Sequence, residues 1–326
     1  MADDPGVPDV TIVIVSYNTR DLLERCLDAA LASAAGISRE VRVIDNASMD
    51  GSAEQVARRW PGVLLTVNRE NRGYAPACNQ GLRAARGRYV LTLNSDALLE
   101  GDALGALVSH LETRPEAAAV GPRLLNADGS TQWICARRAP RFLRSLLGHT
   151  QLPALVPALL PAVAGCYPRS FYERAAEADV LSGACMLIRR EALERAGLLD
   201  ERLLLGYDDV EWSVRARRRG LRLHYQPAAE VTHLGQASRA FDLESNSLLS
   251  LGSTGAFWDI MFAPPAAAVL KLVLLASLGF SLLKNVLLAP VRSGRRARAR
   301  HLLLLMRHCL TMLVRPEAAR EGTSPS

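Results

Sequence analysis

The sequence lacks several patterns that would assign its class at once. Its six cysteines include no Cys-x-x-Cys pair, and a chain of 326 residues can bury a full core without a disulfide framework. Residues 1–6 have neither the basic start nor the apolar stretch of a signal peptide. We therefore expect a globular protein that stays in a reducing cytosol.

Positive charge is in excess, but the excess is local. The net charge is +6, and residues 291–321 alone hold eight arginines against Glu317 and Glu321. The rest of the chain is close to neutral, and it shows no basic groove interleaved with aromatic residues, so no nucleic-acid partner is expected. A basic tail beside an apolar stretch predicts contact with an anionic membrane surface.

The first half of the chain alternates between strand and helix patterns. Residues 10–17 are β-branched and apolar almost without interruption, as in a strand buried on both faces of a parallel sheet. Further strands are predicted at 40–45, 63–67, 88–93 and 117–121, with helices from about residue 19, at 52–60, 75–86 and 102–113. Such alternation predicts an α/β fold with an open, mostly parallel sheet flanked by helices.

The second half is less regular. Residues 137–178 mix arginine, proline and apolar residues without a clean period, and we expect them to form a mobile segment. Order returns with a strand at 179–188, a helix at 190–196, a helix at 208–219 and two short strands at 222–225 and 229–233.

Polar residues end several of the predicted strands, at 16–18, 45–46, 68–73 and 94–96. Ligands bind at the carboxyl ends of strands in open parallel sheets, so these residues are expected to line one crevice. Asp96 can hold a divalent cation against a diphosphate, with a turn-forming aspartate as the alternative. Asp45 can accept a hydrogen bond from a nucleotide base, although an Asx turn explains it equally well.

The loop at 71–79 has the composition of an anion site. Gly73 permits close approach of a ligand, Arg72 can face a phosphate, and the following helix presents its N-terminus. A purely structural loop is the alternative.

Three acidic residues open the helix predicted at 208–219. Asp208 and Glu211 have the spacing of an N-cap residue and its third helical partner. Asp209 has no capping duty, so it can point into a cleft and act as a general base. His233 ends a predicted strand, where a structural histidine is common; near Asp96 and a diphosphate it becomes a candidate metal ligand.

Taken together, these segments resemble glycosyltransferase family 2, in particular its bacterial rhamnosyltransferase-like members with a GT-A fold. The resemblance spans roughly residues 9–240. It rests on ordered motifs: Val-Ser-Tyr-Asn at 15–18, Val-Ile-Asp-Asn-Ala-Ser at 43–48, Asn-Arg-Gly-Tyr-Ala-Pro-Ala-Cys-Asn at 71–79, Leu-Asn-Ser-Asp at 93–96, Leu-Ser-Gly-Ala-Cys-Met-Leu-Ile at 181–188, Asp-Asp-Val-Glu-Trp at 208–212 and Val-Thr-His-Leu-Gly at 231–235.

This resemblance implies a GT-A domain at 1–240, with a nucleotide-sugar-binding half at 9–121 and an acceptor and catalytic-base half at 122–240. Tyr17 and Asp45 would contact the base, Asp96 and His233 would bind Mg²⁺ or Mn²⁺, and Asp209 would be the catalytic base. The other expected substrate contacts are Ser16, Asn71, Arg72, Gly73, Asn79, Asn94, Ser95, Gly183, Asp208, Glu211 and Trp212.

Two positions depart from the family's pattern. Asn94 stands where the metal-binding element often has its first aspartate, which removes one carboxylate. The acidic motif reads Asp208-Asp209-Val-Glu211, closer to galactofuranosyltransferases, so the donor sugar stays open.

The expected activity is inverting transfer of a rhamnose-like or other hexose from a dTDP- or UDP-sugar to a glycan acceptor, lipid-linked in our interpretation, during cell-surface polysaccharide synthesis. One alternative is an inactive sugar-nucleotide-binding or membrane scaffold protein of the same fold. Another is a nucleotidyltransferase, which normally has a Gly-rich phosphate loop after its first strand, where this chain has Ser16, Tyr17 and Asn18.

The composition of the region 241–326 indicates whether the acceptor is bound at a membrane. The apolar stretch at 266–283 is eighteen residues long and includes Lys271. A membrane-spanning helix needs about 20 apolar residues, so this stretch is of borderline length. A single span would separate the catalytic domain from the arginines at 292–300, against the positive-inside rule. We expect an interfacial or re-entrant hairpin, with 301–314 as its second helix, on the cytoplasmic face of the inner membrane. A buried helical subdomain or a homodimer interface is the alternative.

Overall fold

The computed structural model describes residues 6–33, 36–150, 152–235, 243–287 and 295–314. The chain forms two compact units. The first comprises residues 1–139, 166–201 and 208–241, and the second comprises residues 140–165, 202–207 and 242–326. The expected boundary near residue 240 stays a prediction, and the structure adds that two earlier segments belong with the C-terminal unit.

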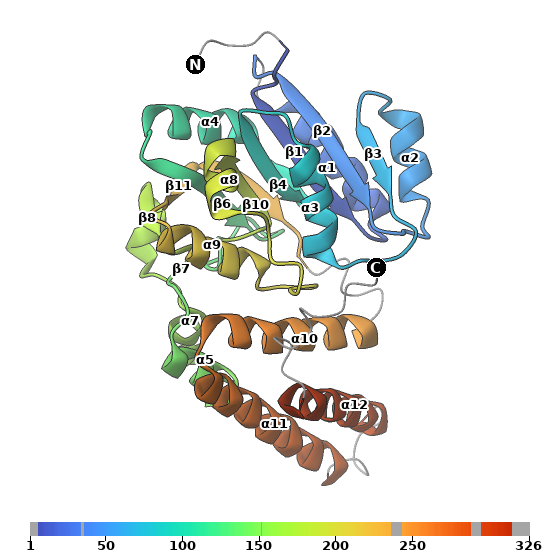
Figure 1. Cartoon of the computed structure of the whole chain (residues 1–326), viewed down its shortest axis with the longest axis vertical. Helices are drawn as coiled ribbons and strands as arrows, with labels where there is room; N and C mark the ends of the chain where they lie inside the picture. Colours follow the sequence, from blue (N-terminus) through green and yellow to red (C-terminus); the bar gives the residue numbers. More distant parts are fainter. Residues whose placement is uncertain (1–5, 34–35, 151, 236–242, 288–294, 315–326) are drawn as a thin grey trace, which may run out of the picture. The chain divides into compact units, whose positions relative to one another are not determined.

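A nine-stranded sheet forms the centre of the first unit (Figure 1). Its order is β3-β2-β1-β4-β10-β6-β11-β5, and β8 pairs with β11. Six strands run in one direction and three against it, because β10 is antiparallel to β4 and β6, and β5 and β8 are antiparallel to β11. The expected mostly parallel α/β sheet is therefore confirmed. The bounds are β1 Val10–Ser16, β2 Arg39–Asp45, β3 Leu64–Val67, β4 Tyr89–Asn94, β5 Ala97–Leu99, β6 Ala117–Leu125, β8 Ala176–Ala178, β10 Cys185–Arg189 and β11 Arg222–His233.

Helices flank this sheet (Figure 1). In α1, Arg20–Ala32, the residues Leu23, Cys26, Leu27 and Ala30 are buried at helical spacing. Helix α3 packs closely on β1, since a Cβ at Gly81 would lie 2.3 Å from Cγ1 of Val13. The other helices of this unit are α2 Ser52–Arg59, α3 Tyr74–Ala84, α4 Ala103–Thr113, α8 Arg190–Ala196 and α9 Asp208–Arg218.

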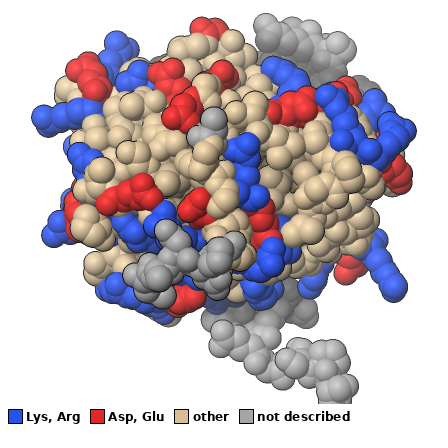
Figure 2. Space-filling model, turned by 90° about the horizontal axis from the view of Figure 1, so that it is seen from above, with Lys and Arg blue, Asp and Glu red and all other residues tan. Residues whose placement is uncertain are grey.

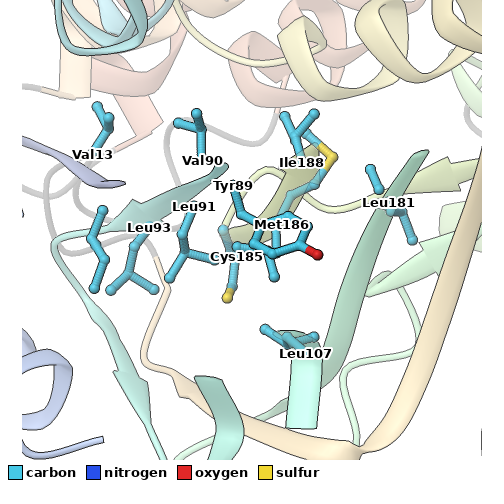
Figure 3. Packing of buried hydrophobic residues seen from close by; sticks show 14 of the residues in the cluster. Val13, Tyr89, Val90, Leu91, Leu93, Leu107, Leu181, Cys185, Met186 and Ile188 are labelled. Carbon is cyan, nitrogen blue, oxygen red and sulfur yellow. The ribbon is translucent and has the colours of Figure 1, made fainter. Parts of the chain in front are cut away.

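The core is centred on the pairing of β4 with β10 (Figure 3). Leu91 is opposite Leu187 and Leu93 is opposite Cys185, and all four side chains are buried. Leu107 of α4 belongs to the same cluster. Each large apolar side chain buried here contributes roughly 1.5–3 kcal/mol, which fixes β4 and hence the residues that follow it.

Two expectations about strands in the second half need correction. The two short strands at 222–225 and 229–233 are one strand, β11, whose register shifts between Gln226 and Glu230 so that pairing with β6 continues. The strand expected at 179–188 is broken at 182–184 into β9, Val180–Leu181, and β10. Strand β9 pairs instead with β7, Ala136–Arg137, in a two-stranded sheet.

The segment 137–178 is not structureless. It contains short helices that a periodicity argument misses: α5 Phe142–Gly148, α6 Leu152–Leu155, η1 Pro157–Leu159, α7 Leu160–Ala164 and η2 Arg169–Glu173. Helices this short carry too few apolar repeats to show a period. The expected mobility of the segment stays a prediction.

The second unit contains three long helices, α10 Leu243–Met261, α11 Pro264–Leu287 and α12 Arg295–Val314. Leu251 of α10 and Cys309 and Met312 of α12 are buried together, and leucines of α11 pack against them. Within the described residues, α11 is the one helix long and apolar enough to cross a membrane, over Pro264–Val286. Arg292, Arg315 and Arg320 of the predicted basic tail lie outside the described residues.

Lys271, which interrupts the apolar stretch of α11, does not face outward. It is 4% exposed, and its Nζ donates to both carboxylate oxygens of Asp259 at 2.8 and 2.7 Å. The outer surface of α11 instead presents Leu272, Phe280 and Leu283, each more than half exposed.

Candidate active site

The carboxyl ends of the parallel strands meet at one edge of the sheet. Ser16 at the end of β1 is in register with Asp45 at the end of β2, and Val15 is in register with Asn94 at the end of β4. His233 ends β11, which runs in the same direction. The polar residues that end β1, β2 and β4 therefore lie at one edge of the sheet, and the expected crevice at that edge stays a prediction.

Asp45 has one oxygen engaged and one without a partner. The side chain is 1% exposed, and Oδ1 accepts a hydrogen bond from Ser48 N–H at 2.9 Å. Oδ2 is buried and has no hydrogen-bond partner in the described part of the chain. The turn alternative therefore accounts for one oxygen only. A buried carboxylate oxygen without a donor is costly, which points to a ligand N–H at this position.

The loop after β3 is organised by Asn46, which sequence reasoning missed as a functional residue. Its Oδ1 accepts from Arg72 N–H at 3.1 Å and from Asn68 Nδ2 at 3.0 Å. Its Nδ2 donates to Asn71 Oδ1 at 2.7 Å. Gly73 adopts φ +83°, and Arg72 is exposed. The predicted Asn71 thus shapes the loop, and both Asn71 and Arg72 are exposed.

Ser16 and Ser95 are buried and joined through a third hydroxyl. Thr19 Oγ1 lies 3.1 Å from Ser16 Oγ and donates to Ser95 Oγ at 2.9 Å. This chain ties the loop after β1 to the turn between β4 and β5. Tyr17 is partly exposed beside it. Sequence reasoning missed this bridging role of Thr19, because a hydroxyl between a strand and a helix is common.

Asp96 and His233 come together where β5 pairs with the end of β11. His233 is in register with Ala97, and Leu234 N–H donates to the Asp96 carbonyl at 3.0 Å. His233 Nε2 lies 3.5 Å from Asp96 Oδ1 and 3.5 Å from Asn94 Nδ2. Asp96 is 7% exposed. Residues 137 positions apart in sequence therefore form one pair of candidate metal donors, and their binding of a metal stays a prediction.

Gln132, which the sequence did not single out, contacts the other side of the His233 ring. Its Oε1 lies 3.0 Å from His233 Nδ1, and its Nε2 donates to the His233 carbonyl at 2.6 Å. The residue stands just after a turn that follows β6, in a stretch with no readable period.

The donor set fits a cation that is shared with a substrate. No group of three or more His, Cys, Asp or Glu side chains that could hold a metal occurs among the described residues. Asp96 and His233 supply two donors 3.5 Å apart, and neighbouring ligands of an octahedral Mg²⁺ lie about 3 Å apart. Such an ion keeps few protein ligands when phosphate oxygens complete its shell.

Asp209 is held at the break between β9 and β10. Its Oδ2 accepts a hydrogen bond from Gly183 N–H at 3.0 Å, and its Oδ1 accepts from Val210 N–H at 2.7 Å. A Cβ at Gly183 would lie 3.1 Å from the Asp209 Cβ, so glycine permits this approach. Arg137 Nη2 lies 3.7 Å from Asp209 Oδ2. Arg137 was missed because it stands at the start of the segment without a period.

Three residues predicted to contact substrate also make hydrogen bonds that stabilise the fold. Trp212 is buried, and its Nε1 donates to the Gly197 carbonyl at 2.9 Å. Glu211 pairs with Arg215 Nε and Nη2, both at 2.8 Å. Asn79 binds the backbone of Leu199 through both ends of its amide, at 2.9 and 3.0 Å. Substrate contacts by these three residues stay predictions.

The capping interpretation of Asp208 needs correction. Helix α9 begins at Asp208 itself, so this residue is in the first turn rather than before it, and Glu211 bonds forward to Arg215. Asp208 is buried beside Gly183, whose added Cβ would lie 3.7 Å from Asp208 Oδ2.

Solved structures with the same architecture are glycosyltransferases. A mannosyltransferase from Pyrobaculum calidifontis in complex with GDP-Man and Mn²⁺ matches with a TM-score of 0.52 and 21% identity, over 96% of this chain and 89% of that one. GalNAc-T7 with UDP, GalNAc and Mn²⁺ matches with a TM-score of 0.53 and 17% identity, over 78% of this chain and 50% of that one. The fold is that of a GT-A glycosyltransferase.

Residues 8–247 match the model of the family described as "Glycosyltransferase like family 2". The chain belongs to glycosyltransferase family 2, as its motifs predicted, and it is an enzyme of that class. The N-acetylglucosaminyl-diphospho-decaprenol L-rhamnosyltransferase of Mycobacterium tuberculosis is 30% identical over 68% of this chain and 75% of its own length. The poly-beta-1,6-N-acetyl-D-glucosamine synthase of Staphylococcus aureus is 26% identical over 68% of this chain and 48% of its own length.

Proposed function

We propose that this glycosyltransferase moves a hexose from a dTDP- or UDP-sugar to a lipid-linked glycan, with inversion at the anomeric carbon and with a divalent cation. The main support for this proposal is the position of Asp209. Its carboxylate is bound by Gly183 N–H, and the next residue, Ala184, accepts a hydrogen bond from Asn94 N–H at 2.9 Å. The general-base candidate and the strand that leads to Asp96 therefore share one backbone segment.

In the proposed reaction, Asp209 removes the proton from an acceptor hydroxyl while the hydroxyl oxygen attacks the anomeric carbon. The bond from that carbon to the phosphate oxygen breaks, and the nucleoside diphosphate leaves with the electron pair. The proton stays on the Asp209 carboxyl. Attack opposite the leaving group inverts the anomeric centre.

Asp96 and His233 are the proposed protein ligands of Mg²⁺ or Mn²⁺, with the diphosphate completing the shell. When bound, the cation supplies charge neutralisation for the leaving group. Asp45 Oδ2 is proposed to accept the N–H of a uracil or thymine base, because that oxygen is buried without a partner among the described residues. Tyr17 would pack beside the base.

The acceptor is proposed to be reached at the cytoplasmic face of the inner membrane. Helix α11 exposes Leu272, Phe280 and Leu283, while its Lys271 is paired inside the helical unit. Lys284 near the end of α11 and Arg298 and Arg300 near the start of α12 are exposed. A spanning hairpin would carry these charges across the bilayer, so we favour helices that lie in the interface.

A donor screen tests the enzymatic proposal. The purified chain is incubated with a panel of nucleotide sugars, Mn²⁺ and a polyprenyl-diphosphate-linked sugar, and released nucleoside diphosphate and glycosylated lipid are measured. We expect transfer from a dTDP- or UDP-sugar and an inverted product by NMR. Binding without turnover would favour the scaffold alternative, pyrophosphate release from a nucleoside triphosphate would favour a nucleotidyltransferase, and a retained anomeric centre would exclude the Asp209 mechanism.

Vesicle flotation tests the membrane proposal. The protein should float with vesicles that contain anionic lipid, and Arg298→Ser/Arg300→Ser should weaken binding by roughly 30-fold at about 1 kcal/mol per arginine. The matched control is Arg25→Ser/Arg58→Ser, which removes two exposed arginines from the first unit. Protein that remains in the dense fraction with anionic vesicles would argue for the subdomain or homodimer alternative.

The distribution of charge on the surface supports testing the arginines of α12 (Figure 2). On the face shown there, acidic and basic side chains are interspersed rather than gathered by sign. Such a surface supplies no broad attraction to an anionic membrane, so the proposal assigns that attraction to the C-terminal helices.

A further inference from the structure

We propose that Gln132 is a positioning residue that fixes His233 as the tautomer with its proton on Nδ1, so that the Nε2 lone pair faces Asp96. This inference rests on the proposed function, since it concerns the residue assigned there as a metal ligand. A histidine binds a metal through an unprotonated nitrogen, and the bond made by its other nitrogen decides which one that is.

The orientation of the Gln132 amide follows from hydrogen-bond chemistry. Its Nε2 lies 2.6 Å from the His233 carbonyl oxygen and 3.3 Å from the Leu125 carbonyl oxygen. Both of these atoms only accept, so the amide NH₂ group must face them. Oε1 is then the atom 3.0 Å from His233 Nδ1, and it can only accept. The proton between these two atoms therefore belongs to Nδ1.

Nε2 of the neutral ring is then left with a lone pair. Asp96 Oδ1 and Asn94 Nδ2 each lie 3.5 Å from it, at and just after the end of β4. Asn94 Nδ2 can donate to that lone pair, which agrees with the same tautomer. The free electron pair of His233 is thereby directed toward the carboxylate with which it would share a cation.

A second glutamine and histidine pair in the same unit has the opposite polarity. Gln226 Oε1 accepts from Ala228 N–H at 3.2 Å, which turns its Nε2 toward His110 Nδ1 at 3.0 Å. His110 Nδ1 therefore accepts, and its Nε2–H donates to His224 Nδ1 at 3.1 Å. The same two residue types thus fix one histidine with its proton on Nδ1 and the other with its proton on Nε2.

The backbone around Gln132 is itself anchored. Gln132 N–H donates to the Leu124 carbonyl of β6 at 2.8 Å, and the Gln132 carbonyl accepts from Cys135 N–H at 3.0 Å. The side chain is therefore presented by a turn tied to the parallel sheet. A ligand preoriented in this way loses less entropy on binding a cation, and partners of this kind are typically worth 10–100-fold in metal affinity.

Nitrogen NMR tests the tautomer directly, without metal or substrate. Long-range ¹H–¹⁵N spectra of the wild-type chain, recorded at a pH where histidine is neutral, distinguish protonated from unprotonated ring nitrogens. We expect His233 to carry its proton on Nδ1 and His110 to carry its proton on Nε2 in the same spectrum. A His233 ring protonated on Nε2 would overturn the proposal, whatever the variants do.

Binding of Mn²⁺ tests the consequence. Free Mn²⁺ is measured by electron paramagnetic resonance in the presence of UDP, for the wild type, Gln132→Leu and the control Gln226→Leu, which removes a glutamine bonded to the other histidine. Gln132→Leu should weaken Mn²⁺ binding by about 10- to 100-fold, and Gln226→Leu by less than about twofold. Equal Mn²⁺ affinity in the Gln132 variant would refute its role; a wild type that binds no Mn²⁺ would refute the metal-dependent function itself.

Discussion

Replacing Asp209 by asparagine is the most direct test of the proposed chemistry. The substitution keeps the volume of the side chain but removes the carboxylate that would take the acceptor proton. General-base catalysis typically contributes 10²- to 10⁴-fold, so we expect the turnover number to fall by about that factor. Affinity for the nucleotide sugar and Mn²⁺ should stay within about threefold, because Asp209 does not belong to the donor pair of Asp96 and His233.

The hydrogen bonds of Asp209 also determine how much the Asp209→Asn substitution lowers the stability of the folded protein. The amide oxygen of asparagine can still accept from Val210 N–H. The amide NH₂ group then takes the place of Oδ2 and faces Gly183 N–H at about 3.0 Å. Two donors facing each other lose the hydrogen bond and cost roughly 1–3 kcal/mol. A modest fall in the melting temperature is therefore expected alongside the loss of turnover.

The assay separates these two effects. Glycosylated product is measured at saturating donor, donor affinity is measured by calorimetry, and unfolding is followed by circular dichroism. Glu177→Gln is the control, since Glu177 is exposed on β8, pairs with Arg217 at 3.5 Å and should leave turnover unchanged when replaced. Asp209→Asn that keeps more than a tenth of wild-type turnover would remove Asp209 from the mechanism.

Three further outcomes are expected. Asp45→Asn should weaken UDP binding by about 10-fold or more, and UDP methylated at N3 should bind the wild type equally poorly by calorimetry, since either change removes one half of the same hydrogen bond. Asp259→Asn should destabilise the protein by about 3–5 kcal/mol by leaving Lys271 buried without its counter-charge, and Asp259→Leu/Lys271→Met should recover most of that loss in a urea titration. Burial, with contributions from Arg114 and His224, lowers the pKa of His110 to about 4. Protonation then favours the unfolded chain, so stability is full above about pH 6.5 and falls by up to about 3 kcal/mol as the pH drops toward 4. The urea midpoint should therefore fall more between pH 7.5 and pH 5 in the wild type than in His110→Phe, and an equal change in both proteins would contradict this.

Regular elements and strand-end residues could be predicted because their causes are local. A β-branched and almost unbroken apolar run such as Val10–Ser16 is typical of a strand in the interior of a parallel sheet. Once the strands are parallel, Asp45 and Asn94 must meet at one edge, and the registers with Ser16 and Val15 confirm this. The family motifs then named Asp96, Asp209 and His233, whose site roles stay predictions.

Other features could not be predicted because they depend on partners far away in the chain. Strand β11 continues through residues that look like a break, because β6 offers pairing on both sides of the bulge. Pairing with a distant strand outweighed the local signal for a break.

The sequence by itself determined the family, most of the strands and helices of the first half and the polar residues at the carboxyl edge, since each follows from periodicity or from an ordered motif. Only the tertiary structure decided which of these residues face one another. It joined Asp96 to His233, left one oxygen of Asp45 without a partner among the described residues, and turned Lys271 toward Asp259. It also brought in Gln132 and Arg137, whose chemistry depends on a neighbouring ring nitrogen and a neighbouring carboxylate that are distant in the chain.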